Sequence, residues 1–189
     1  MKEIETEEFE IEAFAQNEGK EQPPRLFDLT TLQVDCNRKF GFSAEETLNL
    51  IQNLYEQKLT TYPRVDTTYL SEDIYPKVPG ILEKLQFYKR FTDKLKGKKI
   101  RKSKKVFDDK KVTDHHAIIP TGVTPSGISA NHQKVYDMIT KRFISVFYPD
   151  CKVSNSTVLG FIKEVKFKAT GKQILEMGWR EVYADISPE

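Results

Sequence analysis

The sequence is poor in cysteine, tryptophan and long apolar runs. Its 189 residues include two cysteines and one tryptophan, and two cysteines are too few for a disulfide scaffold or a cysteine-based metal cluster. No apolar run approaches the length needed to cross a bilayer, and the acidic residues 1–5 are unlike a secretion signal. A reduced, cytosolic protein is therefore expected. With 38% apolar and 31% charged residues, the composition is typical of a globular chain with a heavily charged surface.

The net charge is only +2, but the two signs are separated along the chain. Residues 1–21 carry eight glutamates against two lysines, whereas residues 84–111 carry thirteen lysines and arginines against three aspartates. This asymmetry favours a polyanion as the partner of the basic part. A solvated basic loop is the alternative that composition leaves open.

Residues 60–67 place a tyrosine, a proline and an arginine in direct succession. Pro63 disfavours the helical conformation at Tyr62 and fixes its own backbone, so a stiff, extended segment is expected. The planar charge of Arg64 can hold a phosphate through two parallel hydrogen bonds. A phenol displayed beside such a group is what nucleophilic attack on a phosphodiester requires. The alternative is a tyrosine packed at a core edge, next to an arginine in a surface ion pair.

Two of the three histidines are adjacent, within residues 113–121. Neighbouring side chains on an extended segment point to opposite sides, so His115 and His116 are not expected to chelate one metal ion. One of them can face a functional surface while the other packs or is solvated. Two ordinary hydrogen-bonded histidines are the alternative.

The centre of the basic region, residues 96–105, lacks helical periodicity and predicts a mobile loop or a hairpin. Its cations can neutralise phosphates without contacting any base, although a merely solvated loop would look the same. The candidate DNA-binding residues are Lys98, Lys99, Arg101, Lys102, Lys104 and Lys105.

Helical patterns fill the middle of the chain. A helix is expected over residues 28–40, a second begins at Ser43 with Glu46 completing a capping box, and a third covers 131–147. Prolines make the helices short or broken over residues 71–89. The first two helices, joined by a short glycine-containing connection, are typical of a helix-turn-helix, but many helical hairpins share this pattern.

Alternating apolar and polar residues predict strands at both ends of the chain. Residues 8–14 alternate, with Phe9 and Ile11 expected on a buried face, and residues 154–169 alternate around a bend near Gly160. Polar residues 16–24 predict a linker.

Further strand-like pieces follow through Trp179 and Tyr183. We therefore expect an α+β chain with two domains. A helical domain, residues 24–149, is inserted into a small antiparallel β domain made from residues 1–23 and 150–189.

Five segments, taken together and in order, resemble a type IA DNA topoisomerase, most closely the bacterial topoisomerase III branch. They are residues 23–33, 40–44, 59–67, 114–121 and 178–180. The combination is far more specific than any one motif. The resemblance covers nearly the whole chain but only part of such an enzyme, so the sequence is expected to be a fragment.

The resemblance implies roles for three residues. Tyr62 would be the nucleophile that forms a 5′-phosphotyrosyl link to one DNA strand, and religation would need no ATP because the link keeps the phosphodiester energy. Arg64 would position the scissile phosphate and stabilise its developing charge. His115, rather than His116, would belong to the phosphate-contacting network. Val65 stands where the family usually has threonine, which removes a hydroxyl but leaves Tyr62 and Arg64 in place.

The resemblance also implies a partner, a cofactor and an architecture. The substrate would be single-stranded DNA bound without sequence specificity in the bacterial cytosol, at the nucleoid, and the fragment would be monomeric. Family members use Mg²⁺ held by an acidic cluster in a domain that precedes this region, so the isolated chain is expected to be inactive.

The helical domain would be a winged-helix, catabolite-activator-like module, and the β domain would belong to the arch of a toroidal enzyme. A non-catalytic DNA-binding helical module is the alternative function. A tyrosine recombinase fits less well, because that class normally surrounds its site with several arginines.

Overall fold

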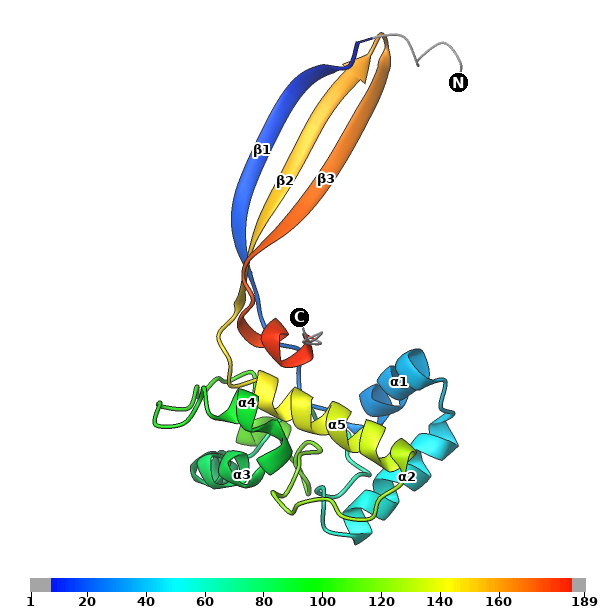
Figure 1. The fold of residues 1–189 in the computed structure, drawn as a ribbon, viewed down its shortest axis with the longest axis vertical. Helices are drawn as coiled ribbons and strands as arrows, with labels where there is room; N and C mark the ends of the chain where they lie inside the picture. The colour runs from blue at the N-terminus through cyan, green and yellow to red at the C-terminus, as the bar shows by residue number, and fades with distance from the viewer. Residues whose placement is uncertain (1–7, 185–189) are drawn as a thin grey trace. The chain divides into compact units, whose positions relative to one another are not determined.

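The computed structural model describes residues 8–184, and the chain divides into two compact units (Figure 1). The β unit comprises the described residues up to Gln22 together with Pro149–Glu181, and the helical unit comprises Pro23–Tyr148 and the residues from Val182 onward. Val182 thus groups with the helical unit, whereas the sequence predicted that the β domain continues to the chain end. Expectations for residues 1–7 and 185–189 lie outside the described residues. The predicted α+β class is confirmed.

The β unit is a three-stranded antiparallel sheet in the order β1-β2-β3. β1 (Glu10–Glu21) comes from the N-terminal part of the chain, whereas β2 (Cys151–Ile162) and β3 (Val165–Glu176) form a hairpin near the other end. β1 pairs along the whole of β2, with Glu21 opposite Cys151. The prediction that both chain ends contribute to one sheet is confirmed.

Three details of the predicted strands are wrong. Most of the expected linker at residues 16–24 is strand, because backbone pairing with β2 continues to Glu21 although the side chains are polar. The hairpin turn lies at Lys163 and Glu164 rather than near Gly160. The final predicted strand piece is instead the 3₁₀ helix η4 (Gly178–Tyr183).

Gly160 has a local reason to lie within β2. A side chain at this position would collide with the ring of Phe9 and with the backbone of Glu10, so glycine allows β1 to approach closely. The turn instead uses Lys163, whose φ of 54° is left-handed. A glycine in an alternating pattern therefore marked a close approach, not a bend.

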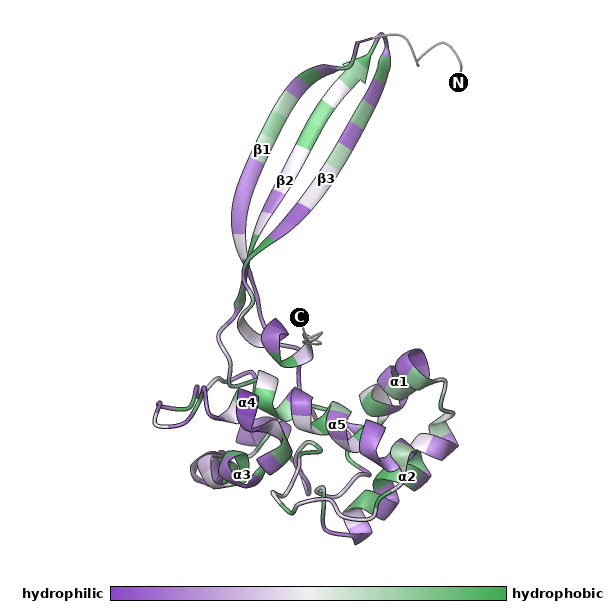
Figure 2. Cartoon of the chain, in the orientation of Figure 1, coloured by the Kyte–Doolittle hydropathy of each residue, from purple (hydrophilic) through white to green (hydrophobic). Residues whose placement is uncertain are grey.

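The expected buried face of the first strand is also wrong. Phe9, Ile11 and Phe14 are 46%, 65% and 61% exposed, and every side chain of β3 is exposed. Figure 2 shows hydrophobic and hydrophilic residues interspersed along all three strands. Within the described residues, the outer part of the sheet has no second layer against which it could bury a face.

The carboxylate of Glu21, at the end of β1, joins three parts of the β unit. It pairs with Lys172 of β3 and with Arg180 of η4. The main-chain carbonyl of Glu21 accepts a hydrogen bond of 2.9 Å from Trp179 Nε1. Hydrogen bonds from Lys172 and then from Arg180 lower the pKa of this carboxyl below its ordinary value. The end of β1 is therefore fixed by charge as well as by backbone pairing.

The helical unit begins with α1 (Leu29–Phe40) and α2 (Ala44–Glu56). Asp28 and Ser43 cap these helices by accepting backbone hydrogen bonds at their first turns. Gly41, with a φ of 74°, ends α1 in the left-handed conformation that favours glycine. Both predicted helix starts are confirmed, because cap residues are local signals.

The longest helix, α5 (Ala130–Ser145), packs against α2. Its inward side matches the predicted pattern, since all five residues expected to face the core are buried: Val135, Met138, Ile139, Phe143 and Val146. In residues 8–184 no helix is both long and apolar enough to span a membrane.

The stretch between α2 and α5 holds only short helices, as its prolines predict. They are η1 (Glu72–Lys77), α3 (Val78–Lys84), η2 (Gln86–Tyr88), α4 (Lys89–Thr92) and η3 (Asp109–Lys111).

The basic segment, residues 96–105, consists of turns and coil, so of the two predicted alternatives it is a loop and not a hairpin. Ile100 is 8% exposed, and its carbonyl accepts a hydrogen bond of 2.9 Å from Tyr75 Oη. Arg101 Nη1 donates to the carbonyl of Tyr148 at 3.3 Å. One apolar anchor and these polar contacts attach the segment to the core, which replaces the regular pairing of a hairpin.

Candidate active site

The segment that carries Tyr62 directly follows α2 and is held by residues 117–121. Thr61 N donates to the carbonyl of Ile119 at 2.9 Å, and Thr61 Oγ1 accepts from Ile119 N at 3.0 Å. The same hydroxyl lies 3.3 Å from the carbonyl of Ala117, to which it donates. These bonds join the tyrosine motif to the histidine motif, which are far apart in the sequence.

This pairing places Tyr62 against His115. Their ring centroids are 4.5 Å apart, with an angle of 39° between the ring planes. Tyr55, in the last turn of α2, packs edge-on against Tyr62 at 5.4 Å. Tyr62 is half-buried, whereas Tyr55 and His115 are exposed, so the phenol lies at the surface of the helical unit and not in its core.

Arg64 lies on an extended segment whose burial alternates. From residue 63 to 67 the odd positions are buried and the even positions exposed. The carbonyl of Val65 accepts a hydrogen bond of 3.1 Å from Leu29 N, which attaches the segment to the start of α1. Val65 is 8% exposed, so an apolar side chain suits this position. Within residues 8–184 Arg64 forms no ion pair, and it forms no hydrogen bond to the ring of Tyr62 or of His115. It is connected to Tyr62 only by lying two residues further along the same segment.

The two histidines face different surroundings, as extended geometry predicts. His116 is half-buried, and its Nδ1 lies 2.8 Å from the carbonyl of Ala117. His115 is exposed and contacts Tyr62. Ala117 N donates to the carbonyl of Tyr69 at 2.9 Å, so the residues directly after the histidines are fixed.

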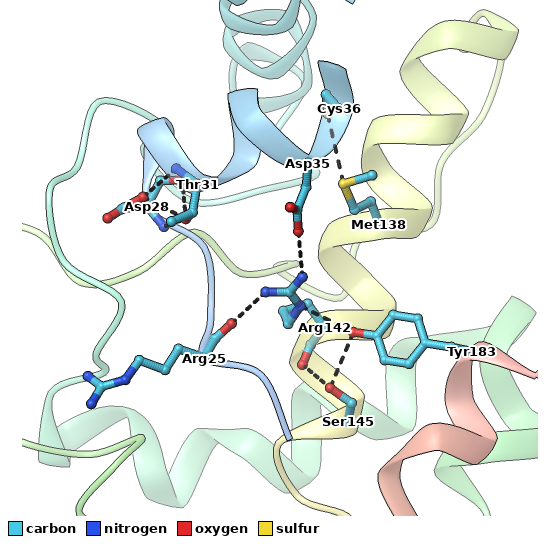
Figure 3. A network of polar contacts seen from close by, with 9 residues as sticks. All are labelled: Arg25, Asp28, Thr31, Asp35, Cys36, Met138, Arg142, Ser145 and Tyr183. Atoms are coloured by element: carbon cyan, nitrogen blue, oxygen red, sulfur yellow. Dashed lines mark hydrogen bonds and ion pairs between the residues drawn. The ribbon is translucent and has the colours of Figure 1, made fainter. Parts of the chain in front are cut away.

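Arg142 of α5 lies at the centre of a network of polar contacts (Figure 3). Its side chain is 14% exposed. Its guanidinium donates to the carbonyl of Arg25 at 2.8 Å, to Asp35 Oδ2 at 2.8 Å and to Tyr183 Oη at 3.2 Å. It also lies 3.9 Å above the ring of Phe27. One cation thereby joins α5, α1, the residues before α1 and the end of η4.

Phe27 connects Arg142 to the segment that follows the histidines. Its side chain is fully buried, and its carbonyl accepts a hydrogen bond of 2.8 Å from Ile118 N. Neither Arg142 nor Thr61 was predicted from the sequence. The signal for Arg142 was a cation placed on the apolar face of a helix, next to Phe143, whereas Thr61 carried no signal that spacing could reveal.

The six predicted DNA-binding cations fall into two groups. Those exposed are Lys98, Lys99, Lys102, Lys104 and Lys105. Arg101 is half-buried against the Tyr148 carbonyl, and Lys102 pairs with Glu72. Within the described part of the chain, Lys98 and Lys99 form no ion pair, so they are available to an external anion.

No metal site accompanies these residues. Between residues 8 and 184 there is no group of three or more histidine, cysteine, aspartate or glutamate side chains that could hold a metal ion.

A family model described as DNA topoisomerase matches residues 1–189. The chain belongs to this family. It is 46% identical to the DNA topoisomerase 3 of Bacillus cereus (strain ATCC 14579) over 165 residues, which cover 85% of the chain and 23% of that relative. It is 43% identical to the DNA topoisomerase 3 of Bacillus subtilis (strain 168) over 171 residues, or 88% of the chain and 23% of the relative. This topoisomerase-family chain thus spans about a quarter of the length of these curated relatives, and the predicted resemblance is confirmed.

The fold is also similar to a solved structure, full-length topoisomerase I from Thermotoga maritima. The TM-score is 0.73 at 24% identity, over 97% of this chain and 31% of that one. The matched residues include both units, and the similarity concerns the fold alone.

Proposed function

We propose that this chain provides the nucleophilic tyrosine of a type IA DNA topoisomerase, with Tyr62 attacking one strand of single-stranded DNA without sequence preference. The observation that carries the proposal is the contact of the Tyr62 ring with His115 at 4.5 Å. Arg64, two residues further on, faces solvent. A surface phenol, a neighbouring imidazole and a free guanidinium supply a nucleophile, a group for proton transfer or hydrogen bonding, and a phosphate clamp.

In the proposed step, Tyr62 Oη attacks the phosphorus. The Oη–P bond forms as the P–O3′ bond breaks, the phenol loses its proton, and the 3′ oxygen gains one. The products are a 5′-phosphotyrosyl link and a free 3′ hydroxyl. Arg64 and His115 stabilise the charge that spreads over the phosphate oxygens. Religation is the reverse reaction and needs no ATP, because the new ester keeps the energy of the old one.

The rest of the organisation is part of the same proposal. Residues 24–149 would form a winged-helix, catabolite-activator-like domain, and residues 1–23 with 150–189 would form part of an arch. The capped pair α1–α2 and the separate sheet support this division. The enzyme would act as a monomer on DNA in the bacterial cytosol, at the nucleoid. Its Mg²⁺ would be bound outside residues 8–184, so a polypeptide of residues 1–189 alone would not relax supercoiled DNA.

The test is a chimera in which this chain replaces the matching segment of the Bacillus cereus DNA topoisomerase 3. The unsubstituted chimera and Tyr55→Phe should relax negatively supercoiled plasmid and yield a covalent protein–DNA complex on denaturation. Tyr62→Phe should keep oligonucleotide affinity within about twofold but form no covalent complex, because its phenolic oxygen is gone. A covalent complex retained by Tyr62→Phe contradicts the assignment. Relaxation by residues 1–189 alone contradicts the proposed inactivity of the isolated chain.

A non-catalytic DNA-binding helical module is the second candidate. The packing of the half-buried Tyr62 ring between Tyr55 and His115 favours it, since such packing alone explains why a tyrosine occupies this position. In that case no chimera would capture DNA covalently, while oligonucleotide binding would persist in all of them.

A further inference from the structure

Phe87 is the most exposed large apolar side chain in residues 8–184, at 68%. It lies in η2 between Leu85 and Tyr88, which are only 3% and 5% exposed. Tyr88 N donates to the carbonyl of Leu85 at 2.9 Å, which closes the turn around Phe87. Both neighbours are therefore anchored in the core, and the Phe87 ring is held outward on a fixed turn. Single exposed apolar residues are common, so the surroundings decide whether this one has a role.

Phe87 borders two hollows in the surface of the helical unit. The larger, of about 400 Å³, is also lined by Arg90 and Phe91. The smaller is also lined by Lys84 and by Val123, which is 47% exposed. The ring thus adjoins open space at the larger hollow, whereas the smaller is a crease with no room for a water molecule. A cation and an apolar side chain lie at the edge of each.

The cations around this ring are not neutralised. Lys84, Lys89 and Arg90 are exposed, and none forms an ion pair with another residue in the described range 8–184. Asp137 also lines the larger hollow, but Lys141 already pairs with it at 3.0 Å. The surface is therefore complementary to a polyanion.

We propose that Phe87, Lys84 and Arg90 form a subsite for unpaired nucleotides, in which a base stacks on the Phe87 ring and the two cations contact flanking phosphates. Stacking tolerates any base, because every base has a π face, and exposed aromatic side chains beside cations are how proteins bind single strands without sequence preference. An apolar protein partner would need a contiguous apolar patch, whereas cations surround this ring. The inference rests on the proposed function in taking single-stranded DNA as the substrate.

Residues 119–123 connect this subsite to the candidate active site. Ile119, the first of them, pairs with Thr61, which lies beside Tyr62. Gly122 packs against the Lys84 side chain, and an added Cβ at this position would lie 3.0 Å from the Lys84 Cβ. Val123 lines the smaller hollow together with Phe87. Four residues of chain span at most about 14 Å. Tyr62 and Phe87 are thus linked through one short segment, and a single strand that contacts both would extend the binding surface beyond the reacting phosphate.

The test measures equilibrium binding of residues 1–189 to an end-labelled oligothymidylate by fluorescence anisotropy. Phe87→Ala should weaken binding by roughly five- to a hundredfold, the range for the loss of one stacked base. Phe87→Leu should lose as much, because leucine keeps apolar bulk but has no π face, and Phe87→Trp should restore binding. Phe14→Ala is the matched control, since Phe14 is 61% exposed in the β unit, and should change affinity by less than twofold.

Salt dependence separates stacking from charge. Phe87→Ala should leave the slope of log affinity against log salt unchanged, whereas Arg90→Gln should reduce it by about 0.7, the value for one phosphate contact on a single strand. No binding by the unsubstituted chain, or Phe87→Ala within twofold of it, overturns the subsite. Full binding by Phe87→Leu also overturns it and indicates an apolar contact instead.

The two proposals fail separately. If Tyr62-dependent covalent capture persists in the chimera while Phe87→Ala binds normally, only the subsite is wrong. If binding depends on Phe87 while no chimera captures DNA, the subsite stands and the catalytic proposal is wrong.

Discussion

At the scale of single residues, the hydroxyl of Thr61 decides how the tyrosine and histidine segments meet. It donates to the Ala117 carbonyl and accepts from Ile119 N, at 3.3 and 3.0 Å. A main-chain donor that loses its partner away from water costs more than the hydrogen bond itself contributes. The contact between Tyr62 and His115 therefore depends on a neighbour that takes no part in the chemistry.

We expect Thr61→Val to destabilise the chain by about 1–3 kcal/mol, because valine keeps the shape but leaves Ile119 N–H without its acceptor. Urea unfolding followed by circular dichroism measures this free energy. Thr30→Val is the control: Thr30 is exposed in α1, and the change there should stay within about 0.5 kcal/mol. If both variants unfold at the same urea concentration, the hydroxyl bridge has no role in stability.

The candidate catalytic residues were easier to predict than the residues that hold them in place. Tyr62 and His115 were singled out by the family resemblance, whose motifs are local in sequence, and the structure places their rings in contact. Their catalytic roles, and that of Arg64, stay predictions. Thr61 and Arg142 act through contacts between segments distant in sequence, which spacing within one segment does not encode.

At the scale of elements, the end of β1 is held by a carboxylate shared between two cations. Glu21 pairs with Lys172 and with Arg180, and its pKa is lowered from 4.5. A carboxyl whose folded-state pKa is depressed stabilises the fold above its unfolded pKa. That stabilisation is lost as the pH falls through the lower, folded value.

The sheet should therefore weaken as the pH falls below about 4.5. Trp179 fluorescence in urea is the measurement, because its indole donates to the Glu21 carbonyl. The unfolding midpoint of the native chain should fall with pH in this window, and that of Glu21→Gln should fall less, since it has no proton to take up. Glu10→Gln, an exposed position on the same strand, should behave like the native chain. Identical pH profiles for all three chains contradict the role given to Glu21.

Helix starts were predictable and strand ends were not, for a physical reason. Asp28 and Ser43 cap their helices through residues three positions away, so the signal lies within one window of sequence. The polar second half of β1 is strand only because β2 pairs with it, and that partner comes more than a hundred residues later.

At the scale of the whole molecule, charge is distributed in a way that the net value of +2 hides. Lys98 and Lys99 are exposed cations of the basic segment, whereas Arg101 and Lys102 are engaged with Tyr148 and Glu72. We therefore expect the phosphate neutralisation predicted for the whole segment to depend mainly on its unengaged lysines.

Replacing Lys98 and Lys99 together by glutamine should lower the salt slope of single-strand binding by about 1.4, at about 0.7 for each phosphate contact. Anisotropy titrations across a salt series measure the slope. The matched double change at Lys166 and Lys168, both exposed on β3, should leave it unaltered. An unchanged slope in the first variant removes the basic segment from the DNA footprint.

The order in which the ribosome makes this chain matters for the sheet. Glu21 cannot pair with Cys151 until Cys151 has been synthesised. That happens roughly 130 residues, or about 7–26 s, later. Closing so long a loop of unstructured chain costs about 4 kcal/mol. The helical unit emerges in between, and the hydrogen bond from Arg142 to the Arg25 carbonyl brings its entry and exit close together. Once that unit has folded, the nascent β1 no longer searches for a distant partner, because the loop between the two strands is already closed.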